Sequence, residues 1–160
     1  MIRFALVFSI VASAVAAMGQ TTVACPWVAS GTAERLLGGG VSVIAHIEGN
    51  AAGSCSFRLK SGDSPASIEI LVGPVDTHPC PQDSLRLKAL GNEAVQCGHA
   101  PSSSQQSDRI AGRIRKVFFV VTMNNIPGAT RLEPSDPLLA DSYAASPIER
   151  LAEQVVGNLY

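Results

Sequence analysis

The chain has 160 residues, of which 46% are hydrophobic and 16% are charged, and its formal net charge at pH 7 is −1. This length is typical of one domain that can bury a core of its own. The near-neutral charge argues against nucleic acid or an anionic membrane surface as the main partner, because both require a basic footprint.

The first residues predict a secretory signal peptide. Arg3 supplies a positive charge, an unbroken run of apolar and small residues extends from Phe4 to Ala17, and polar residues follow from Gln20. This run is shorter than the ~20 apolar residues of a membrane-spanning helix. We therefore interpret residues 1–19 as a cleaved signal and expect the mature N-terminus between Ala17 and Gln20.

A lipoprotein is the competing interpretation of this N-terminus. Cys25 would then be the acylated first residue of the mature chain, but Thr22-Val23-Ala24 lacks the Leu that usually begins a lipobox. We expect an exported protein of the periplasm or the extracellular space, with no transmembrane segment after signal cleavage.

Four cysteines lie in the predicted mature part: Cys25, Cys55, Cys80 and Cys97. In an oxidising compartment an even number favours disulfides, and no two of these cysteines have the Cys-x-x-Cys spacing of a redox motif or zinc knuckle. Two disulfides are therefore expected, although spacing alone leaves three pairings open.

A short helix is predicted at the start of the mature part. Residues 32–37 follow Ser30, a candidate N-cap, and precede Gly38-Gly39-Gly40, which can end the helix. Because these glycines follow a helix and match no phosphate-binding pattern, we interpret them as a helix stop and a turn.

Three strands with short connections come next. Apolar and polar residues alternate over residues 41–48, 54–60 and 68–72, and Cys55 lies on the apolar side of the second segment. The short connections predict an antiparallel meander, since parallel neighbours need a crossover of about a dozen residues or more.

Further strands are predicted in the second half of the chain. Residues 84–88 alternate, the turn Gly91-Asn92 leads into residues 94–97, and the strongest β signal extends from Arg109 to Met123. This last segment exceeds the usual strand length of about five to six residues. It predicts either a hairpin that turns near Gly112 or one strand bulged there.

The clearest helix is predicted at the C-terminal end. Ser146 as N-cap, Pro147 at the first helical position and Glu149 three residues after the cap form a capping box. Apolar residues then recur at spacings of three and four: Ile148, Leu151, Ala152, Val155 and Leu159. We expect a long linker over residues 124–145 and a helix over residues 146–160.

These elements predict one α+β domain over residues 20–160. Its antiparallel sheet should have about five or six strands, with the short N-terminal helix and the amphipathic C-terminal helix packed on it.

Five short patterns follow one another in a recognisable order: Cys25, Leu36-Leu37-Gly38-Gly39, Cys55-Ser56-Phe57, Gly91-Asn92-Glu93-Ala94 and Phe118-Phe119-Val120-Val121. In this order the chain resembles a group of bacterial exported domains and lipoproteins of unknown function. The resemblance implies a disulfide between the first two cysteines and an antiparallel α+β sandwich, and it implies no activity.

The layout of the predicted elements selects the same disulfide. Cys25 immediately precedes the first helix, and Cys55 faces inward on the strand against which that helix should pack. Cys80 and Cys97 then bracket a local excursion whose ends must return to one sheet. We predict the pairs Cys25–Cys55 and Cys80–Cys97.

Two mirrored triplets form a candidate metal site: His78-Pro79-Cys80 and Cys97-Gly98-His99. Reduced, they offer a Cys2His2 set suited to zinc or copper, with Asp76 as a supporting partner. Oxidised, they form a disulfide with two loop histidines, which the compartment favours, so no cofactor is expected. A metal-binding protein or an envelope hydrolase that uses His78, His99 and Asp76 is the alternative function.

Three arginines are predicted to lie on one face of a strand, opposite Ile110 and Ile114: Arg109, Arg113 and Arg115. Such a row can hold a carboxylate or phosphate through guanidinium forks, although a solvated sheet face is the simpler interpretation. The sequence has neither a Gly-x-Ser-x-Gly nucleophile elbow nor a His-Glu-x-x-His pair. The leading hypothesis is a non-catalytic binding module of the cell envelope, whose partner is a protein or a small anionic ligand.

Overall fold

The structure is a computed structural model that describes residues 24–49, 52–60, 66–74, 80, 84–88, 90–97, 107–126 and 145–160. The predicted signal peptide and most of the predicted linker lie outside these residues. The elements, in chain order, are α1 (Ser30–Leu37), β1 (Val41–Ile47), β2 (Gly53–Leu59), β3 (Ser67–Gly73), β4 (Leu85–Leu87), β5 (Glu93–Gln96), β6 (Ser107–Ile114), β7 (Val117–Asn124) and α2 (Pro147–Gly157).

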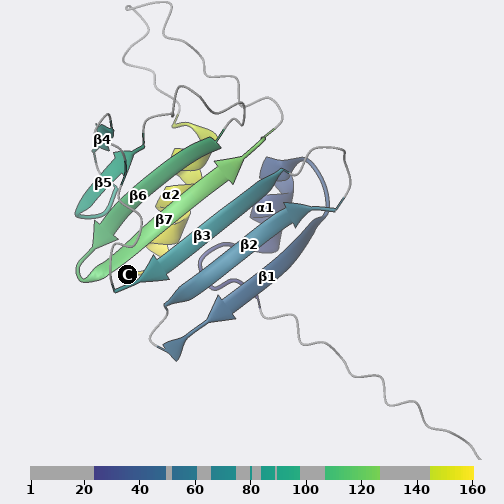
Figure 1. Cartoon of the computed structure of the whole chain (residues 1–160), viewed down its shortest axis with the longest axis horizontal. Coiled ribbons are helices and arrows are strands. Elements are labelled where there is room, and N and C mark those ends of the chain that lie inside the picture. Colours follow the sequence, from purple (N-terminus) through teal and green to yellow (C-terminus); the bar gives the residue numbers. More distant parts are fainter. Residues whose placement is uncertain are drawn as a thin grey trace, which may run out of the picture.

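All strands belong to one antiparallel sheet with the order β1-β2-β3-β7-β6-β5-β4 (Figure 1). Each half is a local meander, and for β1, β2 and β3 this is what the short connections predicted. The pairing of β3 with β7 joins the two halves in the middle of the sheet. The α+β class is confirmed, but the sheet has seven strands rather than five or six.

The additional strand arises because the segment from Arg109 to Met123 splits into β6 and β7 at a place other than Gly112. Ile114 pairs with Val117, so the chain turns at Arg115-Lys116. Arg115 has a left-handed φ of 54°, and its backbone N–H donates to Oδ1 of Asn92 at 2.6 Å. This bond from a neighbouring turn stabilises a conformation that an arginine rarely adopts.

Gly112 lies inside β6 and has a packing role instead. A Cβ atom at this position would lie 2.6 Å from a ring carbon of Phe119 and 2.8 Å from the carbonyl oxygen of Glu93. Because Gly112 has no side chain, the Phe119 ring can pack against its backbone in the core. The predicted hairpin is confirmed, but it turns at Arg115-Lys116 rather than at Gly112, and the alternative of one strand bulged at Gly112 is wrong.

Both helices pack on the same face of the sheet. α1 contacts β1 and β2, and α2 contacts β6 and β7. Figure 1 shows both helices behind the sheet, on one side of it. They cover a single core whose largest buried side chains include Trp27, Leu37, Phe57, Ile68, Ile70, Ile110, Phe119, Ile148 and Leu151.

The helix ends follow the predicted signals in part, since α2 ends at Gly157, with Asn158 as C-cap, rather than at Tyr160. The capping box of α2 is present, since the backbone N–H of Glu149 donates to Oγ of Ser146 and the N–H of Ser146 donates to Oε2 of Glu149. α1 ends at Gly38, which has a left-handed φ of 78°. The start of α1 differs from the prediction, because Ser30 is already helical and Ala29 is the N-cap.

Both predicted disulfides are confirmed, Cys25–Cys55 and Cys80–Cys97. The Sγ of Cys25 is bonded to Cys55, so it cannot also form a thioether with a lipid, which argues against the lipoprotein interpretation. Two disulfides indicate an oxidising environment outside the cytoplasm. Within the part of the chain that the structure describes, neither helix has the length and apolar character needed to cross a membrane.

Removal of the first disulfide should destabilise the domain more than removal of the second. The bonds link residues 30 and 17 positions apart, and the loop-entropy relation gives roughly 3–4 kcal/mol for each. Cys55 is also buried in the main core, so serine there leaves a polar group among apolar ones. Urea unfolding of C25S/C55S and C80S/C97S measures both losses, and a C25S/C55S protein as stable as wild type would contradict this role.

Gly112→Ala should lower the free energy of unfolding by about 1–3 kcal/mol, because the new methyl group overlaps the Phe119 ring. Gly73→Ala is the matched control, since Gly73 ends β3 and a methyl group there would have open space within 4 Å. The control should change stability by less than about 0.5 kcal/mol. Thermal unfolding compares the two, and equal stabilities would show that Phe119 does not need the space.

Candidate binding surface on the open face of the sheet

The face of the sheet opposite the helices is the candidate site, and we call it the open face. Alternate residues of a strand point to opposite sides, so the residues between the core positions all belong to this face. On β2 these residues are Ser54, Ser56 and Arg58, and on β3 they include Glu69 and Leu71. Figure 1 shows both helices on the other side of the sheet.

A polar row crosses the middle of the open face. The strand register places Ser56 beside Glu69, Glu69 beside Thr122, and Thr122 beside Arg109. These four side chains come from β2, β3, β7 and β6, so residues far apart in sequence form one line. The row lies in a shallow depression with a volume of about 500 Å³.

Apolar side chains flank this polar row within the depression. Leu71 and Val120 are paired on β3 and β7, two residues along the strands from the row. Ile44 lies at the β1 side and is 52% exposed. The depression therefore offers hydrogen-bonding and apolar surface side by side, as small-molecule and peptide sites generally do.

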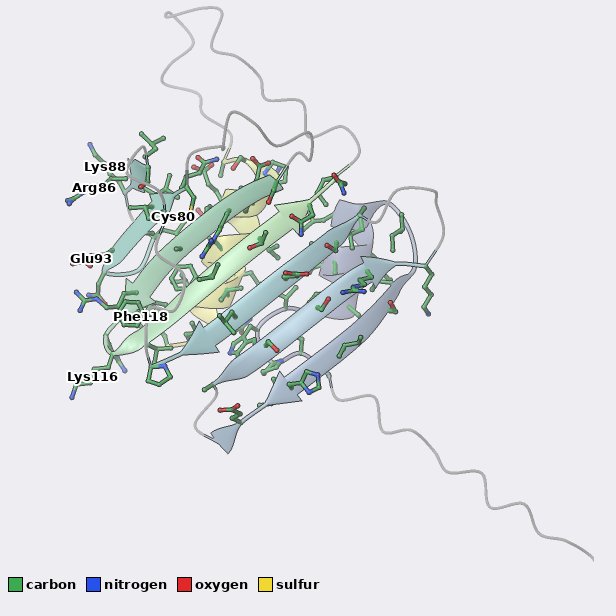
Figure 2. All side chains as sticks on the ribbon, viewed as in Figure 1. Cys80, Arg86, Lys88, Glu93, Lys116 and Phe118 are labelled. Atoms are coloured by element: carbon green, nitrogen blue, oxygen red, sulfur yellow. A yellow bond between two sulfur atoms is a disulfide. The ribbon has the colours of Figure 1, made fainter. Side chains whose placement is uncertain are left out.

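The second disulfide lies at the opposite side of the open face from β1. Cys97 forms a small apolar cluster with Ala111 and Val120, and Cys80 packs against this cluster. Cys80 lies at the β5–β6 side of the sheet in Figure 2. The disulfide thereby shields the apolar residues next to the depression on this side.

Ser56 presents an unused hydrogen-bonding group in the depression. Its Oγ is buried and has no hydrogen-bond partner among the described residues. Buried hydroxyl groups are almost always paired with protein, water or ligand. A bound water or a polar ligand atom is the natural partner for this hydroxyl.

The charges in the depression are unevenly spaced. Arg58 on β2 and Arg109 on β6 lie on either side of Glu69 on β3. Arg58 and Glu69 are exposed, and Arg109 is half-buried. Two guanidinium groups and one carboxylate leave a formal excess of positive charge, which suits a ligand with an anionic group.

The structure separates the three arginines that were predicted to form a row. Arg109 and Arg113 share the open face of β6, but Arg115 lies in the turn after β6 and does not belong to this face. The row prediction is wrong for Arg115 because β6 ends at Ile114. Sequence spacing of two residues places side chains on one face only while the strand continues.

The three guanidinium groups also have different surroundings. Arg113 Nη2 donates to Oε1 of Glu93 at 3.1 Å, and its guanidinium lies 6.0 Å from the centre of the Phe118 ring. Arg115 lies 5.7 Å from the centre of the Tyr160 ring. Glu93 and Phe118 lie near each other at this end of the sheet in Figure 2. Only Arg109 of the three contributes to the depression.

The mirrored His-Pro-Cys and Cys-Gly-His triplets cannot supply thiolate ligands, because Cys80 and Cys97 are joined. His78, His99 and Asp76 lie outside the described residues, so the hydrolase hypothesis stays a prediction. Among the residues that the structure describes, no group of three or more His, Cys, Asp or Glu side chains is placed to hold a metal ion.

Comparisons of this chain with models of protein families, with curated proteins and with solved structures found no match. The resemblance to bacterial exported domains and lipoproteins therefore stays a prediction.

The Arg113–Glu93 ion pair should contribute little to stability. The two side chains are 40% and 70% exposed, and exposed pairs contribute about 0.2–1 kcal/mol. A double-mutant cycle of R113A and E93A, measured by urea unfolding, should give a coupling in this range that falls with added salt. A coupling of several kcal/mol would show that the pair is a structural element of the β5–β6 edge.

Proposed function

We propose that this chain is a non-catalytic binding module of the cell envelope, in the periplasm or outside the cell, and that its open face binds an anionic segment of a protein partner. The observation that carries the proposal is the amphipathic depression across β1, β2, β3, β7 and β6 on a face that no described helix covers. On a sheet face that only contacts water, polar side chains are expected to be exposed. Here Arg109 is half-buried, and the Ser56 hydroxyl is buried.

The spacing of the charged groups favours an extended ligand over a small anion. Arg58 and Arg109 are three strand intervals apart, and Arg58 lies two residues along the strands from the row that contains Arg109. At about 4.8 Å per interval and ~3.3 Å per residue, their Cα atoms are about 16 Å apart. Glu69 lies between them and repels an anion placed at the centre. A peptide segment of about five residues spans this distance at ~3.3 Å per residue, and its carboxylates can reach both arginines without facing Glu69.

The same segment can use the rest of the depression. Its polar backbone groups can bond to the Ser56 and Thr122 hydroxyls, and its apolar side chains can contact Leu71 and Val120. Arg113 and Arg115 take no direct part in this proposal, because neither lines the depression and Arg115 lies in the turn after β6.

The test is binding of a partner isolated from envelope extract to variants on opposite sides of the molecule. Arg58→Ala combined with Arg109→Ala should raise the Kd at least tenfold, because a lost charge-assisted hydrogen bond costs about 1.5–3 kcal/mol. Arg150→Ala is the control, since Arg150 is exposed on α2, on the helix side of the sheet.

Isothermal titration calorimetry gives the three Kd values, and circular dichroism confirms that each variant is folded. An unchanged Kd for the double variant, or an equal loss for Arg150→Ala, would place the binding surface away from the open face.

A further inference from the structure

The two edges of the sheet differ in how they are protected against further strand pairing. β4 at one edge has only three residues, and Arg86 and Lys88, both exposed, lie at this edge (Figure 2). Short edge strands and basic side chains are common means of preventing edge-to-edge association. β1 at the other edge has seven residues and contains no Pro, Asp, Glu, Lys or Arg. The β1 edge therefore lacks these protective features.

The hydrogen bonds that flank β1 show which of its backbone groups face outward. The N–H of Lys60 donates to the carbonyl of Gly40 at 3.0 Å, and the N–H of Glu48 donates to the carbonyl of Ala52 at 2.8 Å. Bonding alternates along an antiparallel ladder, so the even-numbered residues of β1 bond to β2. The N–H and C=O groups of the odd-numbered residues point away from the sheet: Val41, Val43, Ala45 and Ile47. No described strand pairs with them.

We propose that two copies of this chain associate through their β1 strands, which pair antiparallel about a twofold axis at Ile44 and form one continuous sheet. In this register Val43 lies opposite the partner's Ala45, and Val41 lies opposite the partner's Ile47. All four are outward-bonding residues, so every one of their free backbone groups gains a partner. The proposal goes beyond the binding function and does not depend on it.

The side chains of β1 are complementary to themselves in this register. On the helix side, the apolar residues Val41, Val43, Ala45 and Ile47 meet the same set in reverse order, so the apolar face continues across the axis. On the open face, Ile44 lies opposite the partner's Ile44 in a non-hydrogen-bonded pair, where the Cα atoms approach to about 4.5 Å. Ile44 and Ile47 are 52% and 39% exposed in the single chain, and pairing removes apolar surface of both from water.

The pattern selects a second copy over an unrelated strand. Apolar positions one, three, five and seven of a seven-residue strand are symmetric about its centre, and Ile44 is that centre. A twofold axis requires this kind of self-complementarity. Ser42 lies opposite the partner's His46, and no two acidic or basic residues of β1 oppose each other, since β1 contains no Asp, Glu, Lys or Arg.

Sedimentation equilibrium of the mature, oxidised protein tests the proposal without any ligand. The wild-type protein should reach twice the monomer mass as its concentration rises through the micromolar range. Ile44→Lys should stay monomeric, because two lysines would face each other at the axis. Leu85→Lys is the matched control, because Leu85 is an exposed leucine on the opposite edge strand, and this variant should associate as wild type does.

Hydrogen exchange provides a second measurement that does not depend on a variant. The amide protons of Val43 and Ala45 should exchange more slowly as protein concentration rises, while those of β4 should not change. A wild-type protein that is monomeric up to its solubility limit, or an Ile44→Lys protein that associates as wild type does, would overturn the proposal. A monomeric wild-type protein would leave the proposed binding at the open face intact, and the Arg58 and Arg109 variants test that binding separately.

Discussion

The pairing of β3 with β7 is the constraint on which the remaining structure depends. Each half of the sheet is a local meander, and only this pairing connects strands that are distant in sequence. It places Ile70 beside Val121 on the helix side and Glu69 beside Thr122 on the open face. A slip of one residue would expose Ile70 and bury Glu69, so the large difference in burial between the two faces fixes the register.

The two faces are completed by different means once this register is fixed. On the helix side, α1 and α2 cover the core, and the Cys25–Cys55 disulfide ties the segment before α1 to β2. The side-chain amide of Asn158 donates to the carbonyl of Trp27 at 2.8 Å, so the C-terminal segment is fixed to the same N-terminal segment. On the open face, the Cys80–Cys97 disulfide shields a much smaller apolar cluster and leaves the depression beside it accessible.

Local patterns in the sequence predicted most elements because their causes are local. The alternation over residues 41–48 and the capping box at Ser146 act through neighbouring residues, and both are confirmed. The hairpin of β6 and β7 was predicted, but the role of Gly112 was not, because Gly112 makes room for the Phe119 ring, which only the β6–β7 register brings near. Likewise, the polar row of the open face joins four strands, so no spacing within one segment predicts it, and the arginine spacing indicated a row that the turn at Arg115 interrupts.

β1 connects the two surfaces for which we propose functions. Ile44 lines the depression with its side chain, and it also lies at the centre of the edge that we propose to associate. In such a dimer the two Ile44 side chains meet, so the two depressions lie next to each other on one continuous open face. A ligand that contacts the depressions of both copies binds the dimer better than the monomer, and mass action then favours association. The coupling is reciprocal. Association strengthens ligand binding by the same free energy by which the ligand strengthens association.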